Sequence, residues 1–122
     1  MATFFYTKTH EYIREEDGNY FLGISDHAQQ ELGDITYVEL PAVGSEFAKG
    51  DVCCTVESVK AVAEVYASIA IKVVAINEQL EDEPELINQD ALGKGWILQI
   101  EPADPSGLSG MMDQAAYDAM EK

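Results

Sequence analysis

Short runs of β-branched and aromatic residues, separated by turn-forming residues, are the feature that most limits how this chain can fold. Residues 35–40 form one such run, which Pro41 ends. In residues 52–58 apolar and polar side chains alternate, as in a half-buried strand. A third run, residues 96–100, follows a glycine-rich turn and precedes Pro102. Because these residue types favour extended structure, the chain is expected to be mainly β.

The two ends of the chain add a hairpin and two helices to this prediction. Residues 4–14 and 20–24 flank residues 17–19, Asp-Gly-Asn, a sequence typical of a tight turn. Residues 26–32 are followed by a glycine and are predicted to form a short helix. Residues 113–120 are predicted to form a C-terminal helix. The expected fold therefore contains strands and a few short helices.

Residues 59–80 permit two interpretations. Their apolar residues are spaced alternately by three and four, as on one face of a long helix. The same segment also alternates strictly from residue 63 to residue 73, and it is rich in valine and isoleucine, which favour strands. Neither pattern decides between helix and strand.

The size and charge of the chain exclude several classes of function. Its 122 residues have room for one domain, so residues 1–122 are expected to form a single domain. With 23 acidic and 7 basic residues the net charge is −16, which repels nucleic acids and anionic membranes and favours a soluble monomer. The acidic residues 81–85 are interpreted as a solvated turn and not as a metal site.

The chain shows no signal for membrane insertion or secretion. No apolar stretch approaches the eighteen or so residues of a membrane span, and residues 1–9 lack the regions of a signal peptide. We therefore expect a location in the cytoplasm if the source is bacterial. In a eukaryote we expect the mitochondrial matrix, with a transit peptide removed.

Catalytic constellations are missing from the sequence. It contains no phosphate-binding loop, dinucleotide fingerprint, zinc-spaced Cys and His set or nucleophile elbow. His10 and His27 are expected at the surface without a catalytic role. Cys53 and Cys54 are adjacent, so in a strand they are expected to face opposite ways and to remain ordinary thiols. The alternative of an enzyme with a thiol nucleophile is not favoured, because the sequence places no cationic residue or helix start near Cys53 or Cys54 to lower a thiol pKa.

The run Glu57-Ser58-Val59-Lys60-Ala61 resembles the lipoylation motif of glycine cleavage system H proteins. Further pieces of the chain are similar to this family in order and spacing, and the resemblance covers residues 6–117. These pieces are His10-Glu11-Tyr12, Gly23-Ile24-Ser25, Ala28-Gln29, Leu32-Gly33-Asp34, Val38-Glu39-Leu40-Pro41, Val43-Gly44, residues 84–88 and Gly95-Trp96.

The resemblance implies a barrel-sandwich hybrid, as in lipoyl and biotinyl domains, with Lys60 at the tip of a tight hairpin. Lys60 would then carry a covalent lipoyl group, and no metal or catalytic residue is implied. Glu57 and Ser58 would shape the turn for recognition by the lipoyl-attaching enzyme, together with Val59 and Ala61. Glu11 matches a residue of the cleft that protects the loaded arm in this family. An exposed carboxylate at a strand edge is the alternative interpretation of Glu11.

The function implied by the resemblance is that of a non-catalytic carrier of the glycine cleavage system. Its lipoyl arm would receive an aminomethyl group from glycine decarboxylase, pass it to aminomethyltransferase and be reoxidised by dihydrolipoamide dehydrogenase. A lipoyltransferase or lipoate ligase would attach the arm. The alternatives are a homologue that relays lipoyl groups to other proteins, a lipoyl or biotinyl domain of another complex, and an interaction protein whose Lys60 is unmodified.

One segment departs from the family pattern. The family has Ser/Ala-Pro-x-Ser-Gly where this chain has Ala67-Ser68-Ile69-Ala70-Ile71, so its proline and glycine are missing. Since an isoleucine adopts positive φ poorly, Ile71 is expected either to lie in a rearranged turn or to strain the backbone. A rearranged turn that leaves Lys60 in place is the preferred interpretation.

Overall fold

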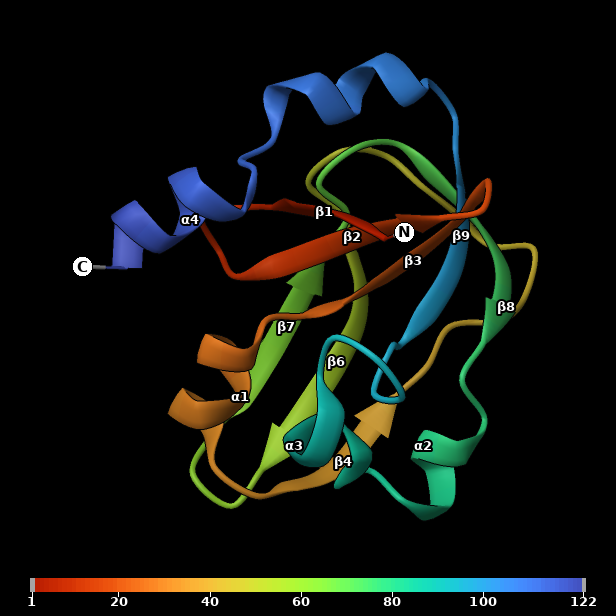
Figure 1. Ribbon diagram of the computed structural model, residues 1–122. Coiled ribbons are helices and arrows are strands. Elements are labelled where there is room, and N and C mark those ends of the chain that lie inside the picture. The colour runs from red at the N-terminus through yellow and green to blue at the C-terminus, as the bar shows by residue number, and fades with distance from the viewer. Residues whose placement is uncertain (1, 122) are drawn as a thin grey trace.

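The computed structural model describes residues 2–121 and contains two antiparallel β-sheets (Figure 1). The larger sheet has six strands in the order β1-β2-β3-β9-β8-β5. Their bounds are β1 (Thr3–Tyr6), β2 (Glu11–Glu16), β3 (Asn19–Ile24), β9 (Leu98–Pro102), β8 (Ile71–Ile76) and β5 (Glu46–Phe47). The three strands of the smaller sheet are, in spatial order, β4 (Ile35–Glu39), β6 (Val52–Ser58) and β7 (Val62–Tyr66). The prediction of a mainly β chain is confirmed.

Short helices connect and cover the strands. They are α1 (Asp26–Leu32), α2 (Gln79–Asp82), α3 (Leu86–Asp90), the 3-10 helix η1 (Pro105–Gly110) and α4 (Gln114–Glu121). The predicted helices at residues 26–32 and 113–120 are therefore confirmed, whereas the acidic segment 81–85 begins inside α2 and is not only a turn. No helix in the described part of the chain is long and apolar enough to cross a membrane.

The predicted hairpin near the N-terminus is formed by β2 and β3. Asp17 and Gly18, between the two strands, have φ angles of 53° and 82°. Glycine adopts such angles freely and aspartate tolerates them better than most residues, which explains why this pair forms the turn. The strand predicted at residues 96–100 is β9, which begins and ends two residues later than predicted. Its pairing with β3 starts at Leu98, opposite Leu22, and continues to Ile100, opposite Tyr20.

The ambiguous segment 59–80 forms strands and not one long helix. β7 belongs to the smaller sheet and β8 to the larger one, so residues 67–70 carry the chain from one sheet to the other. Ala67, Ile69, Ile71 and Val73 are all buried, as the alternating pattern requires. The choice between one helix and two strands, which the local spacing did not settle, is decided by the burial of both β7 and β8 against the common core.

A common hydrophobic core lies between the sheets. Apolar side chains from both sheets are fully buried in it, among them Ile13, Leu22, Val38, Val56, Val65, Val73 and Leu98. A second cluster consists of Tyr6, Tyr12 and Tyr117, with the rings of Tyr6 and Tyr117 stacked at 4.4 Å. This cluster fixes the C-terminal helix α4 to the N-terminal strands.

Cys53 and Cys54 do not point to opposite faces of their strand, so that prediction is wrong. The pairing of β6 with β7 shifts between Val52 and Cys54, and this bulge lets both thiols enter the core as free cysteines. A hydrogen bond with Cys53, followed by burial, raises the pKa of the Cys54 thiol well above its ordinary value. Both residues are buried free thiols, as expected.

Candidate functional site

Lys60 lies at the exposed tip between β6 and β7, which Figure 1 shows just below α1. Ser58 holds the backbone of this tip. Its Oγ accepts hydrogen bonds from the amides of Lys60 at 3.2 Å and Ala61 at 3.1 Å, and it donates one to the Ala61 carbonyl at 3.0 Å. One side chain thus bonds three backbone groups of the turn, in addition to the backbone bond from the Ser58 amide to the Ala61 carbonyl at 2.9 Å, and braces an exposed tip.

The tip also docks against the end of α1. The Val59 amide donates to the Asp34 carbonyl at 3.1 Å, and the Lys60 side chain runs past Gly33, where an added β-carbon would lie 3.4 Å from Cε of the lysine. Gly33 ends α1 with φ 76° and ψ −151°, a conformation that only glycine adopts readily. Within residues 2–121 Lys60 forms no ion pair. Its ammonium group is therefore held near the helix end and is open to solvent.

The outer face of the smaller sheet leads up to this tip. Tyr37, Glu57 and Val62 are paired across the three strands and so lie in one row on that face. Tyr37 is 49% exposed, Val62 63% and Val59, within the tip, 67%. Glu57 is half-buried between the two apolar side chains. An enzyme that reaches Lys60 from this side would meet this row of two apolar side chains and Glu57, with the exposed Glu39 and Glu64 two residues further along the same face.

Glu11 is buried, so its interpretation as an exposed carboxylate at a strand edge is wrong. Only 2% of it is exposed. Its carboxylate accepts hydrogen bonds from the hydroxyls of Thr7, at 2.6 Å, and Thr9, and from the amide of Tyr66 at 3.4 Å. A buried carboxylate needs such donors, and three of them converge here.

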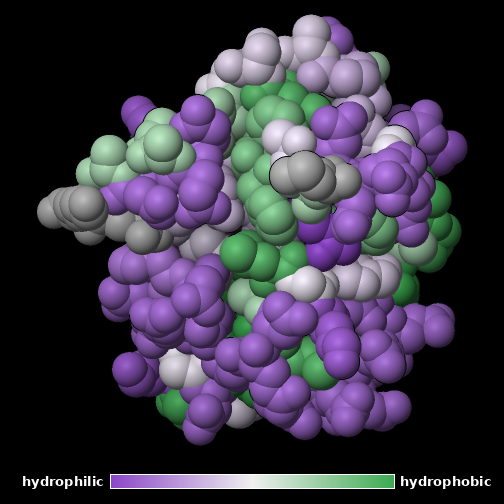
Figure 2. Space-filling model, in the orientation of Figure 1, coloured by the Kyte–Doolittle hydropathy of each residue, from purple (hydrophilic) through white to green (hydrophobic). Residues whose placement is uncertain are grey.

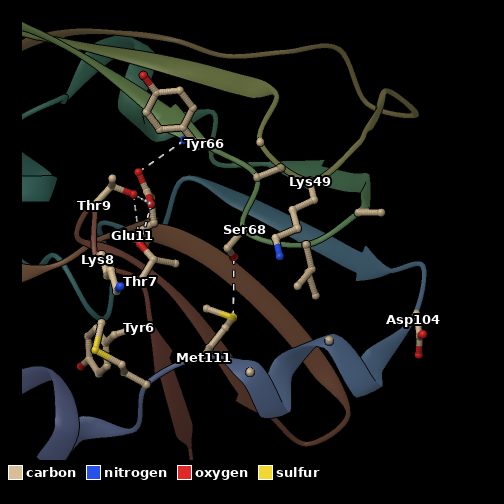
Figure 3. Close-up of a pocket in the computed structure, with 17 residues that line it drawn as sticks. Tyr6, Thr7, Lys8, Thr9, Glu11, Lys49, Tyr66, Ser68, Asp104 and Met111 are labelled. Carbon is tan, nitrogen blue, oxygen red and sulfur yellow. Dashed lines mark hydrogen bonds between the residues drawn. The ribbon is translucent and has the colours of Figure 1, made fainter.

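Glu11 lines a pocket of about 540 Å³ at the end of β7 that is remote from Lys60 (Figure 3). The loop before β2, the residues after β7 and the end of η1 form its walls. Tyr66 also lines it and lies six residues beyond Lys60, which corresponds to about 20 Å along an extended strand. The structure therefore does not bring Glu11 into contact with Lys60. β7 connects the two.

Thr7, Thr9, Gly33 and Asp34 support the two predicted residues, but no sequence pattern signalled the roles of the threonines. The loop from Thr7 to Glu11 closes through two backbone bonds, Thr7 N–H to the Glu11 carbonyl and His10 N–H to the Thr7 carbonyl. This closure turns both hydroxyls toward Glu11. Such a turn is visible only once the backbone is known.

His10 and His27 are half-buried and pack against each other, and the side chain of His27 remains 34% exposed. Their ring centres are 4.6 Å apart. His10 Nδ1 lies 2.6 Å from the hydroxyl of Tyr117, which lies 2.6 Å from Ser25 Oγ. The loop that holds Glu11 is thereby joined to α4 and to the start of α1.

The departure at residues 67–71 is a rearranged turn without backbone strain. Among the described residues only His10 and Asp17 have positive φ without being glycine, so Ile71 starts β8 in an ordinary conformation. The Ala67 amide donates to the Asp51 carbonyl at 2.8 Å, and the Ala70 carbonyl accepts from the amide of Ala103 at 2.9 Å. The turn lies at the far end of β7 and leaves the Lys60 tip in place.

Comparison with known proteins agrees with this geometry. The family model described as "Glycine cleavage H-protein" matches residues 4–122. The chain belongs to this family. It is 52% identical over 116 residues to the glycine cleavage system H protein of Shewanella loihica, covering 94% of this chain and 90% of the relative. The H protein of Beijerinckia indica is 53% identical over 112 residues, which covers 92% and 90% of the two chains.

A solved structure supports the fold assignment as well. The crystal structure of a glycine cleavage system H protein from Mycobacterium marinum superimposes with a TM-score of 0.88 at 30% identity and covers 98% of this chain and 96% of that one. The expected barrel-sandwich fold with short helices is therefore confirmed. As a member of the H-protein family the chain is a lipoyl carrier of the glycine cleavage system and not a catalytic subunit.

The chain's own residues fit a covalently attached cofactor. Lys60 is exposed, unpaired within residues 2–121 and placed on a braced turn, so its amine is available for amide formation. Within that same range no three His, Cys, Asp or Glu side chains converge in a way that could hold a metal ion. Lys60 is thus the one candidate attachment point that the motif and the geometry share.

Proposed function

We propose that Lys60 is the lipoyl attachment site of this H protein. The observation that carries the proposal is the exposed position of Lys60 on a turn braced by Ser58 and docked against Gly33 and Asp34. A tip of this kind projects the amine away from the sheets, where an attaching enzyme and later the partner enzymes can reach it. Amide formation removes the positive charge of Lys60 and leaves a long neutral side chain.

The bound lipoyl group supplies a dithiolane that carries the aminomethyl group between enzymes. The residues of the chain itself position the Lys60 side chain. Ser58 fixes the direction of the tip, and the Gly33–Lys60 contact sets the path of the side chain along the end of α1. Glu57 and the exposed Val59 and Val62 present the surface that the attaching enzyme, a lipoyltransferase or lipoate ligase, would recognise.

Glu11 is proposed to receive the loaded end of the arm when the arm folds back along β7. Its buried carboxylate is oriented by Thr7 and Thr9 and lines a pocket at the end of β7, which supports a role in shielding a labile cationic group from water. Replacement of Glu11 by glutamine keeps the shape and removes the charge. The carried group should then be lost to water faster, as measured by its decay on the isolated loaded protein.

The proposed partners are glycine decarboxylase, aminomethyltransferase and dihydrolipoamide dehydrogenase. A carrier that visits several enzymes must bind each of them transiently. The net charge of −16 supports this behaviour, since like-charge repulsion favours a monomer and acidic surfaces favour rapid encounters with basic ones. Rates with all three enzymes should therefore fall as salt is raised.

The test is mass spectrometry of the chain after incubation with lipoate, ATP and a lipoate ligase. One lipoyl adduct is expected, located at Lys60 by peptide mapping. Lys60→Arg should show no adduct, whereas the matched control Lys94→Arg, at another exposed lysine, should be modified like the parent. An adduct that persists in Lys60→Arg, or a folded parent that stays unmodified, would overturn the assignment.

A further inference from the structure

Asn88 belongs to the family-like segment 84–88, and no role has yet been given to its side chain. It lies in α3, which packs beside α1 (Figure 1). The preceding residue, Ile87, is fully buried in the core. The backbone at Gly95 also lies against α3, since an added β-carbon there would be 2.8 Å from Cα of Ile87. Packing on two sides therefore fixes the short helix from which the Asn88 side chain extends.

The amide group of Asn88 bonds the two backbone groups that flank Asp34. Its Oδ1 accepts from the Ile35 amide at 2.8 Å, and its Nδ2 donates to the Gly33 carbonyl at 2.8 Å. These groups lie where α1 ends and β4 begins, a junction at which backbone groups need partners from outside the two elements. One side chain thereby holds residues 33–35 from both sides.

A second amide orients the side chain of Asn88. Asn88 Nδ2 also donates to Oε1 of Gln29 at 2.9 Å, and Nε2 of Gln29 donates to Oδ1 of Asp26 at 2.9 Å. Gln29 is buried between these partners. An ionised carboxylate can only accept hydrogen bonds, so Asp26 determines which end of each amide is the donor. The oxygen of Asn88 is thereby directed at the Ile35 amide and its nitrogen at the Gly33 carbonyl.

The segment that Asn88 holds is the support of the Lys60 tip. The Asp34 carbonyl accepts from the Val59 amide at 3.1 Å, and Gly33 lies against the Lys60 side chain. Figure 2 shows a largely hydrophilic surface over α1 and α3, as expected of a junction held by hydrogen bonds. Asn88 therefore acts on the tip through Asp34 and Gly33.

We propose that Asn88 is a positioning residue for the attachment of lipoate, because it fixes the segment on which the Lys60 tip rests. This role rests on the proposed attachment at Lys60. The attaching enzyme needs the amine in a defined place, and a misplacement of about 1 Å can slow a reaction about 100-fold. Ser58 braces the tip from within, and Asn88 braces the support beneath it.

Asn88→Ala removes all three hydrogen bonds of this side chain. Hydrogen exchange of the Val59 amide, measured by NMR on the unmodified chain, should become about five- to tenfold faster than in the parent. Exchange of the Lys60 and Ala61 amides should change by less than about twofold, because both bond to Ser58 Oγ. With lipoate, ATP and a lipoate ligase, kcat/KM for modification of the folded variant should fall several-fold.

Asn77→Ala is the matched control. Asn77 is a buried asparagine whose Nδ2 donates to the carbonyls of Lys94 and Trp96, at 2.9 and 2.7 Å, and these residues take no part in the tip. Its loss should lower the denaturation midpoint as Asn88→Ala does. Exchange of the Val59 amide and kcat/KM of the ligase should remain those of the parent.

Asn88→Asp is a second variant of nearly the same size. It can still accept from the Ile35 amide but can no longer donate to the Gly33 carbonyl or to Gln29. Exchange of the Val59 amide should therefore be faster than in the parent, and kcat/KM should again fall. This variant tests the role of Asn88 even where the alanine variant does not fold.

The outcomes separate this role from the attachment itself. Folded Asn88→Ala or Asn88→Asp that is modified with the kcat/KM of the parent would overturn the role and leave Lys60 as the attachment site. An equal fall of kcat/KM in Asn77→Ala would also overturn it, because a general loss of stability would then explain both variants. A folded parent that gains no adduct at Lys60 would overturn the proposed attachment and this role with it.

Discussion

The chain turns at both ends of β7, and the two turns are held in different ways. The tip at residues 58–61 is exposed and depends on the hydrogen bonds of Ser58. In the turn at residues 67–70, Ala67 and Ile69 are buried, and Ile69 packs close to Gly107 of η1. A turn held by packing tolerates new residues that fill the same space, which explains how the family's proline and glycine could be lost here. A turn that depends on the hydrogen bonds of one side chain, such as Ser58, does not tolerate replacement of that residue.

The largest expected effect is that of Ile69→Ala in the buried turn. Ile69 is 7% exposed and contacts the Gly107 region, so its truncation should lower the free energy of unfolding by about 2–4 kcal/mol. Guanidinium denaturation measures this change. The rate of lipoylation at Lys60 should remain that of the parent, because the tip lies at the opposite end of β7.

Ile69→Val serves as the graded control for that prediction. It removes one methyl group and should lower the free energy of unfolding by only about 1 kcal/mol. Equal stability of Ile69→Ala and the parent would show that packing does not hold this turn. A slower lipoylation of folded Ile69→Ala would show that the two turns are coupled.

Gly33→Ala should have the next largest effect, at the support of the tip. An alanine at φ 76° and ψ −151° is strained, and its β-carbon would lie 3.4 Å from Cε of Lys60. We expect the free energy of unfolding to fall by about 2 kcal/mol and lipoylation to slow. Gly44→Ala is the matched control, since Gly44 also has positive φ but open space where a β-carbon would lie. It should lose stability and keep the parent's lipoylation rate, and equal rates in both variants would argue against the Gly33–Lys60 contact.

Ser58→Ala tests the tip itself. It removes the acceptor of two amides and a donor to one carbonyl, at a cost of about 1 kcal/mol of folding stability. Hydrogen exchange at residues 59–61 should become faster and lipoylation slower. Ser58→Thr keeps the hydroxyl and should restore both. Ser109→Ala removes one exposed hydroxyl bond elsewhere and should change neither measurement.

Much of the fold was predictable because its signals are local. The strand at residues 52–58, the turn at Asp17-Gly18 and the predicted short helices each follow from neighbouring residues, and all of them are present. The choice between helix and strands for residues 59–80 was not predictable in this way. Both spacings suit an apolar face, and only the positions of β7 and β8 in two different sheets decide it.

The remaining features depend on contacts that no local pattern encodes. The bulge at Cys53 results from how β6 and β7 align over several residues. The burial of Glu11 depends on the closed loop that turns Thr7 and Thr9 toward it, and His10 meets Tyr117 across 107 positions of sequence. Lys60 could be proposed from its motif alone, whereas the residues that support it had to be seen in the structure.

The smallest effect on stability is expected from Val59→Ser, which asks whether the exposed tip carries recognition as well as position. Val59 is 67% exposed, so its loss from the surface should change the free energy of unfolding by less than about 0.5 kcal/mol. We expect an exposed apolar side chain beside the proposed attachment site to contact the attaching enzyme. KM for the lipoate ligase should therefore rise while kcat stays constant. Val74→Ser, on β8 and 44% exposed, is the matched control and should leave KM unchanged. An unchanged KM for Val59→Ser would mean that the enzyme reads the turn geometry set by Ser58 and not the apolar surface around it.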